Sequence, residues 1–272
     1  MAESFREWNS RGANGRPRPA LQRGDIARQG SREMNYRWDW SILFKDTYMG
    51  WLWSGLLWTV IISLASWAVA LTIGLLAGAA RSAPSRSARL LAGIYIDVFR
   101  NVPPLVQLFL WYFVLPEVVP DSFGLWLKRD LPYPEVVTAV VAIGLFAGSR
   151  VAEQVRAGIE AVGAPLMPAA LATGLRPAQA YRLIVLPLGL RAIVGPLTSE
   201  FLITVKLSSL SLTIGVLELT AQSRHVENYT FQGFEAFTFA TIGYLVIGLC
   251  VTGLMRFIDI RIGGAALRKT PA

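Results

Sequence analysis

Two long stretches of this 272-residue chain contain no charged residue, and they constrain its fold more than any other feature. They run from Gly55 to Ala80 and from Ala236 to Met255. A helix of roughly 20 apolar residues crosses the hydrocarbon core of a bilayer and pairs its own backbone groups there. Because 53% of the chain is hydrophobic and only 16% is charged, the sequence predicts an all-α integral membrane protein.

Three further apolar stretches carry internal charges. They are Leu90 to Leu115 with Asp97 and Arg100, Glu135 to Val162 with charges from Arg150 onward, and Ile193 to Leu217 with Glu200 and Lys206. Lys and Arg are enriched in cytoplasmic connections. The connections at 81–89 and 176–191 each hold three arginines and no acid, whereas those at 116–135 and 218–235 are mainly acidic. Five spans fit this alternation, with the N-terminus outside and the C-terminus inside.

The two ends of the chain complete the predicted domain organisation. Residues 1–50 form an N-terminal tail with nine basic and six acidic residues, but its membrane-proximal part, 34–47, has no net charge. The Arg-, Gly- and Pro-rich part before about residue 34 has no apolar period and is predicted to be disordered, and either Met1 or Met34 is the true start. The membrane domain covers 51–256, and 257–272 form a cytoplasmic tail.

Several kinds of chemistry are excluded by composition. The only cysteine, Cys250, rules out an internal disulfide and a thiolate cluster, and the only histidine, His225, rules out a histidine-rich metal site. The phosphate-binding Gly-x-x-x-x-Gly-Lys-Ser/Thr pattern is absent, as is the Gly-x-Ser-x-Gly elbow. We therefore predict no catalytic residue, no metal and no cofactor, and the net charge of +8 is explained by membrane topology rather than by nucleic acid.

The basic connection at 165–187 contains four prolines and a glycine at positions that predict a hairpin of two short helices. Pro165 and Pro168 fit a first helical turn, Gly174 can end that helix in the left-handed conformation, Pro177 starts the second helix and Pro187 stops it. The hairpin is expected to expose small residues on which another protein packs closely. That surface comprises Ala169, Ala170 and Thr173. The alternative is an ordinary linker.

In this hairpin the sequence resembles the permease subunits of ABC importers. The resemblance rests on the spacing of their EAA motif, which is matched by Pro168, Ala169, Ala170, Gly174, Ile184, Leu186 and Pro187. In that family the motif forms the coupling helix that docks on the ATPase. Proline replaces glutamate at position 168, which removes a favourable charge from a helix N-terminus and implies weaker docking.

Other segments resemble the polar amino acid branch of these permeases. The segment 99–107, Phe-Arg-Asn-Val-Pro-Pro-Leu-Val-Gln, and the segments 150–159 and 196–201 look like its signatures, while 51–55 and 109–112 look most like a glutamate/aspartate permease. Leu207 departs from the polar residue usual after the family's lysine. The resemblance implies a type I importer fold in the bacterial inner membrane, a second permease subunit that is a paralogue or another copy, a separate ATP-hydrolysing subunit and a periplasmic solute-binding protein.

Charges inside spans are costly and usually face a cavity or a partner. Glu153 and Arg156 are three residues apart and are expected to pair, as are Asp97 and Arg100. Glu200 and Lys206 are six residues apart and share no helical face well, so each needs another helix, water or substrate as its partner. A candidate substrate path for an anionic amino acid comprises Lys206, Glu200, Thr204, Ser208, Ser209, Glu153 and Arg156. Gly74 and Gly78 form a small-xxx-small pair that predicts helix packing.

Three alternatives remain. The substrate is another polar amino acid, such as glutamine or a basic one; the chain is a motor-free channel or scaffold; or it is a secondary transporter. Secondary transporters normally show internal repeats, which this chain lacks. Neither a channel nor a scaffold needs the spacing of the hairpin.

Overall fold

The computed structural model describes residues 36–81 and 85–262. The chain divides into two compact units, Met1–Asp39 and Trp40–Ala272, and only residues 36–39 of the first are described. The second unit is built from helices, with no strand in its described part. The predicted N-terminal disorder, the start site and residues 263–272 of the C-terminal tail fall outside the described residues.

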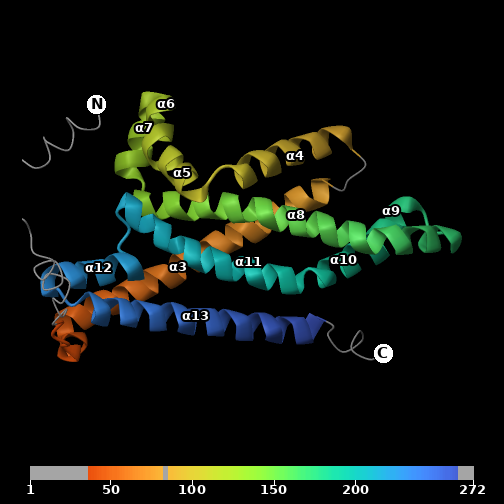
Figure 1. Cartoon of the computed structure of the whole chain (residues 1–272). Coiled ribbons are helices and arrows are strands. Elements are labelled where there is room, and N and C mark those ends of the chain that lie inside the picture. The colour runs from red at the N-terminus through yellow and green to blue at the C-terminus, as the bar shows by residue number, and fades with distance from the viewer. Residues whose placement is uncertain (1–35, 82–84, 263–272) are drawn as a thin grey trace, which may run out of the picture. The chain divides into compact units, whose positions relative to one another are not determined.

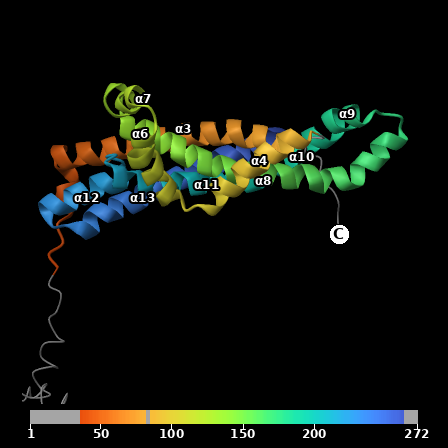
Figure 2. The ribbon, with the colours of Figure 1, turned by 90° about the horizontal axis from the view of Figure 1, so that it is seen from above.

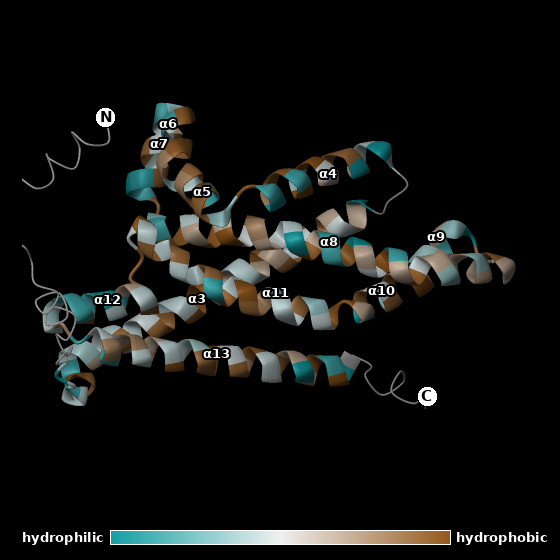
Figure 3. Cartoon of the chain, viewed as in Figure 1, coloured by the Kyte–Doolittle hydropathy of each residue, from teal (hydrophilic) through white to brown (hydrophobic). Residues whose placement is uncertain are grey.

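Four long helices run alongside one another and form the body of the second unit (Figures 1 and 2). They are α3 (Asp46–Arg81), α8 (Pro134–Ala172), α11 (Val194–Leu207) with its 3-10 extension η5 (Ser208–Ile214), and α13 (Gly233–Ile262). Each is long and apolar enough to cross a membrane. Their ribbons are mainly brown and white in Figure 3, with hydrophilic residues in short stretches. Four of the five predicted spans are thus confirmed as helices.

The second predicted span is a broken helix. The expectation of one helix from Leu90 to Leu115 is wrong, because α4 (Arg86–Asn101) and the segment beginning with α5 (Pro104–Phe109) meet at 104°. Proline lacks an N–H and pushes the preceding residue toward extended backbone. Val102, before Pro103 and Pro104, is extended at φ −92° and ψ 130°. Beyond the break, α5, the π-helical η2 (Leu110–Val114) and α6 (Leu115–Val118) turn away from the long helices (Figure 1).

A glutamine side chain satisfies backbone groups at this break. The Gln107 amide nitrogen donates to the carbonyl oxygens of Phe99 at 2.7 Å and Val102 at 2.8 Å. Unpaired carbonyls are costly at membrane depth, so irregular backbone there needs such partners. Gln107, which is 6% exposed, therefore holds the two halves of the broken span together.

Close packing of α3 against α8 is made possible by glycine, as predicted for Gly74 and Gly78. A Cβ at Gly74 would lie 2.6 Å from the Val151 Cβ, and one at Gly78 would lie 2.6 Å from the Ala152 carbonyl oxygen. Small residues let membrane helices approach closely where no hydrophobic driving force exists. The same core continues to α11, where the Phe201 ring stacks on Trp67 of α3 at a centroid distance of 4.8 Å.

A buried carboxylate ties α12 (Leu219–Thr230) to α13. Glu218 precedes α12 and accepts hydrogen bonds from the backbone N–H groups of Thr220 and Ala221 at 2.9 and 2.8 Å. The Tyr244 hydroxyl of α13 donates to it at 2.7 Å. Burial raises the pKa of the Glu218 carboxyl, and these hydrogen-bond donors act to lower it.

Two short helical segments, α7 (Asp121–Leu125) and η3 (Trp126–Asp130), connect α6 to α8.

Candidate functional site

The predicted hairpin is present at the end of the bundle farthest from α12 (Figure 1). The first arm is the end of α8, and Gly174 turns the chain with φ +86°, as predicted. The second arm begins with α9 (Pro177–Ala180), which Pro177 opens at its first position. It continues through the π-helical η4 (Tyr181–Val185) into α10 (Leu186–Ala192).

Three proline predictions in the hairpin are wrong. Pro165 and Pro168 lie inside α8 rather than in the first turn of a separate helix. They remove hydrogen bonds to the carbonyls of Ala161 and Ala164, but both of these residues are exposed, so water can replace the bonds. Pro187 does not stop the second arm. The Leu186 N–H bonds five residues back to the Tyr181 carbonyl, and this wider turn accommodates the proline ring.

The hairpin surface differs from the expected one at Ala170. Ala169 and Thr173 are exposed as predicted, but Ala170 is only 3% exposed, and Ala180 on the second arm is fully buried. Two larger apolar side chains, Leu171 and Leu183, are 41% and 63% exposed. The other motif positions are either exposed, at Pro168, Gly174 and Pro187, or half-buried, at Ile184 and Leu186.

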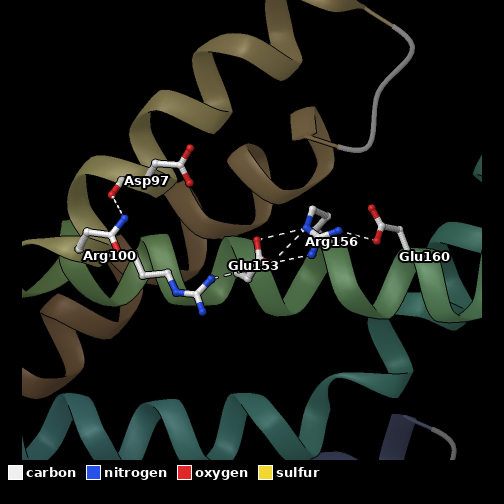
Figure 4. Close-up of polar contacts among 6 residues, drawn as sticks. Asp97, Arg100, Glu153, Arg156 and Glu160 are labelled. Atoms are coloured by element: carbon white, nitrogen blue, oxygen red, sulfur yellow. Dashed lines mark hydrogen bonds and ion pairs between the residues drawn. The ribbon is translucent and has the colours of Figure 1, made fainter.

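A row of charged side chains follows one side of α8 (Figure 4). The Glu153 carboxylate accepts from the Arg156 guanidinium at 2.6 Å, which confirms that predicted pair. Arg156 also contacts Glu160 at 2.5 Å. From α4, the Arg100 guanidinium reaches Glu153 at 3.9 Å. Glu153 therefore links the broken span to α8.

The predicted pair of Asp97 and Arg100 does not form. Arg100 reaches Glu153 of α8, whereas the structure records for Asp97, among the described residues, only a side-chain contact to its backbone carbonyl, from the Asn101 amide at 2.7 Å (Figure 4). Residues three apart on a helix can pair, but the longer arginine side chain finds Glu153 instead.

Glu200 lies between α11 and α8 and is 1% exposed. It accepts from the Arg150 Nε at 2.7 Å and from the Gln154 amide nitrogen at 3.3 Å. Of the three partners expected for Glu200, namely another helix, water or substrate, the structure shows another helix. Arg150 and Gln154 were not predicted as those partners, although a buried acid in one span predicts a base in a neighbouring span.

The hydroxyl groups near Lys206 are engaged by the backbone of their own helix and do not surround the lysine as a substrate site would. Lys206 is exposed, and no ion pair reaches it within residues 36–81 and 85–262. The hydroxyls of Thr204, Ser208 and Ser209 donate to carbonyls of their own helix, those of Glu200, Val205 and Lys206. Thr204 and Ser208 are fully buried. Their assignment to a substrate path stays a prediction.

A cavity of about 220 Å³ opens between α4 and α8, beside this charged row. Its lining comprises Arg100, Arg150, Glu153, Gln154 and Ala157. The Arg100 and Arg150 side chains are 53% and 38% exposed, so their remaining N–H groups are accessible. Guanidinium groups bind carboxylates through paired hydrogen bonds. Among the described residues, no group of three or more His, Cys, Asp or Glu could hold a metal ion.

Replacing Arg150 with methionine is expected to destabilise the protein by about 2–3 kcal/mol, because it leaves the buried Glu200 with only the longer Gln154 contact. Thermal unfolding in detergent measures the change. Arg156→Met, on the same helix, is the control and is expected to cost at most about 1 kcal/mol, since its acidic partners are better solvated. Adding Glu200→Gln should restore most of the loss. Equal effects of the two methionine substitutions would contradict this account.

Comparison with known proteins agrees with this architecture. The family model described as "Binding-protein-dependent transport system inner membrane component" matches residues 70–264. The glutamate/aspartate import permease protein GltJ of Escherichia coli is 37% identical over 235 residues, covering 83% of this chain and 95% of GltJ. The glutamine transport system permease protein GlnP of Escherichia coli is 32% identical over 225 residues, covering 83% and 98%.

Solved structures share the fold. A chain of the crystal structure of an amino acid ABC transporter with histidines superposes with a TM-score of 0.70 at 28% identity, covering 83% of this chain and all of that one. The inward-facing MetNI methionine ABC transporter gives a TM-score of 0.62 at 19% identity, which supports the fold alone. The chain is therefore a multi-pass inner membrane protein that belongs to the family of binding-protein-dependent transport system inner membrane components.

Proposed function

We propose that this chain is the permease subunit of an ABC importer for polar amino acids, with glutamate and aspartate as its substrates. In this proposal it is not itself an enzyme. A separate ATPase subunit docks on the hairpin, a second permease subunit completes the path, and a periplasmic solute-binding protein delivers the amino acid. The N-terminus lies outside and the C-terminus inside, following the alternation of basic and acidic connections.

The observation that carries the proposal is the hairpin together with the family membership. The hairpin exposes small residues beside Leu171 and Leu183 at one end of the bundle, and its basic residues match a cytoplasmic location. ATP binding would close the motor dimer, draw two such hairpins together and tilt the spans. A ligand shifts a conformational equilibrium only if it binds one state more tightly than the other. The loaded binding protein must therefore bind the outward-open state of the importer more tightly than the inward-open state.

The cavity beside α8 supports an anionic substrate. Arg100 and Arg150 present two accessible guanidinium groups to it, whereas Glu153 is already engaged by Arg156. Glutamate and aspartate each carry two carboxylates, and guanidinium groups bind carboxylates through paired hydrogen bonds. Relatives of this chain are named for glutamate/aspartate and for glutamine, so experiment must decide between these substrates.

Uptake by the complete transporter in proteoliposomes tests the substrate. Labelled glutamate, loaded on its binding protein, is expected to enter in an ATP-dependent manner, and aspartate should compete. Arg100→Gln should reduce glutamate uptake by about tenfold, since it removes a charge-assisted contact without leaving a buried charge unpaired. If only glutamine or a basic amino acid were taken up, the substrate assignment would be wrong but the importer function would stand. Uptake without ATP would favour a channel.

A further inference from the structure

We propose that a second cavity, between η2, α6, η3 and the start of α8, binds the headgroup and the first part of an acyl chain of phosphatidylethanolamine. In this site the Lys128 ammonium binds the lipid phosphate, and the Glu117 carboxylate binds the lipid ammonium. The inference goes beyond the proposed function and requires only that the chain is a multi-pass inner membrane protein. It is independent of the ATPase and of the amino acid that is carried.

This cavity has the size and the lining of a small-molecule site. Its volume is about 480 Å³. Ligand pockets usually measure about 300–1,000 Å³ and are mainly apolar, with a few polar groups that fix the orientation of the ligand. Aromatic and aliphatic side chains, such as Trp111 and Leu127, form most of the lining. Among the described residues that line it, Glu117 and Lys128 are the two charged ones.

The wall that faces α8 is a closely packed unit. A Cβ at Gly124 of α7 would overlap the Pro116 carbonyl oxygen of α6, so these two helices approach as closely as glycine allows. Glu117 of α6 and Lys128 of η3 form an ion pair that joins those two elements. This unit stands beside the start of α8 (Figure 1). The cavity is therefore formed by packed helical elements and not by an irregular loop.

The charged and apolar parts of the cavity follow the direction in which α8 crosses the membrane. Glu117 and Lys128 belong to the segments that precede α8, whereas Val137 and Val141 lie on α8 within the charge-free run 136–149. The two valines are one turn apart on the same face of the helix. Val141 lies about 10 Å along α8 from its first residue. The cavity thus extends from the level of the lipid headgroups toward the hydrocarbon.

The outer surface of the same segments is suited to the bilayer interface. Val118 and Leu125 are exposed, at 76% and 50%. Phe123 and Trp126 are also exposed, and their rings stack at a centroid distance of 5.6 Å. Tryptophan is enriched at the headgroup level of membranes. Phospholipids are therefore the molecules that surround this cavity.

The ion pair determines which headgroup fits. The Lys128 and Glu117 side chains are 45% and 68% exposed, and an exposed ion pair contributes little to stability, so a ligand that carries both charges can replace it. Phosphatidylethanolamine carries a phosphate and a primary ammonium group. Phosphatidylglycerol has no cation for Glu117, and the quaternary ammonium of phosphatidylcholine has no N–H to donate to the carboxylate.

Native mass spectrometry of the complete transporter, with each of these three phospholipids added in turn, tests the site. Phosphatidylethanolamine is expected to bind about tenfold more tightly than the other two, because it alone adds a charge-assisted hydrogen bond to Glu117. Equal affinity for all three lipids would overturn the proposal. The measurement needs neither ATP nor amino acid, so failure of this site is distinguishable from failure of the importer function.

Substitutions at Glu117 test the headgroup contact. Glu117→Gln should remove the preference for phosphatidylethanolamine, and Glu117→Lys should reverse it in favour of phosphatidylglycerol, since two cations then face the phosphate. Glu160→Gln is the matched control, because it neutralises the acid of another exposed ion pair, which lies outside this cavity. It should leave the lipid preference unchanged. A Glu117→Lys variant that keeps its thermal midpoint and still prefers phosphatidylethanolamine would contradict the proposal.

A photoreactive phosphatidylethanolamine, with a diazirine near the start of one acyl chain, locates the apolar part of the site. Labelled peptides are expected to contain Val137 or Val141. Val141→Trp fills this part of the cavity and should abolish most of the labelling, whereas Leu249→Trp, at an exposed position on α13, should not. If benzoylphenylalanine at Val141 crosslinks to protein and not to lipid in the native membrane, another protein occupies the cavity and the proposal is wrong.

Discussion

Replacing Gly78 with leucine is expected to cost about 3 kcal/mol of stability and to abolish most of the folded yield. A Cβ at this position would lie 2.6 Å from both the Ala152 carbonyl oxygen and the Val155 Cβ, so α3 and α8 must separate before any larger side chain fits. Backbone cannot move aside as a flexible side chain can. The thermal midpoint and the monodisperse yield in detergent measure the effect.

Gly253 provides the matched control for this prediction. It also lies in a long apolar helix, α13, but a Cβ there would meet no atom within 4 Å. Gly253→Leu should therefore change stability by no more than about 0.5 kcal/mol. If the two leucine variants unfolded at the same temperature, the close approach of α3 and α8 would not be a main source of stability.

Replacing Gly174 with valine is expected to lower coupled transport by about tenfold or more while leaving the spans inserted. The residue turns the hairpin at φ +86°, where a Cβ meets no neighbour but a β-branched residue is strained by at least about 1–2 kcal/mol. Relief of that strain would displace Ala169 and Thr173, the exposed small residues proposed to contact the ATPase. Uptake and ATP hydrolysis are measured together, because uncoupling reduces the first more than the second.

Asparagine at the same position separates backbone strain from the loss of glycine itself. Asn adopts the left-handed conformation more readily than other residues with a Cβ, so Gly174→Asn should retain most of the transport. A Gly174→Val variant that transports as well as the unaltered chain would refute the role assigned to the hairpin.

The sequence predicted those elements whose determinants are local. The charge-free runs give α3 and α13, because apolar length alone sets a span, although α3 begins earlier, at Asp46, and α13 extends to Ile262. Gly174 and Pro177 mark the hairpin turn through their own backbone preferences. The pair of Glu153 and Arg156 follows from helical spacing.

Features that depend on neighbouring helices were not predictable in the same way. The break at Pro103 is visible in the sequence, but its 104° angle depends on how α5 packs and on the Gln107 amide. The partner of Glu200 lies 50 positions away, at Arg150. The wider π-helical turn that allows Pro187 inside the second arm has no local sequence signature.

The most direct test of the central claim, that this chain is the membrane half of an ATP-driven importer, is ATP hydrolysis by the complex purified from its native membrane through a tag on this chain. We expect a co-purifying ATPase whose activity rises when a glutamate-loaded or aspartate-loaded binding protein is added. The hairpin variant Gly174→Val should lose that stimulation. If no ATPase co-purifies under conditions that preserve a known importer, the claim is contradicted.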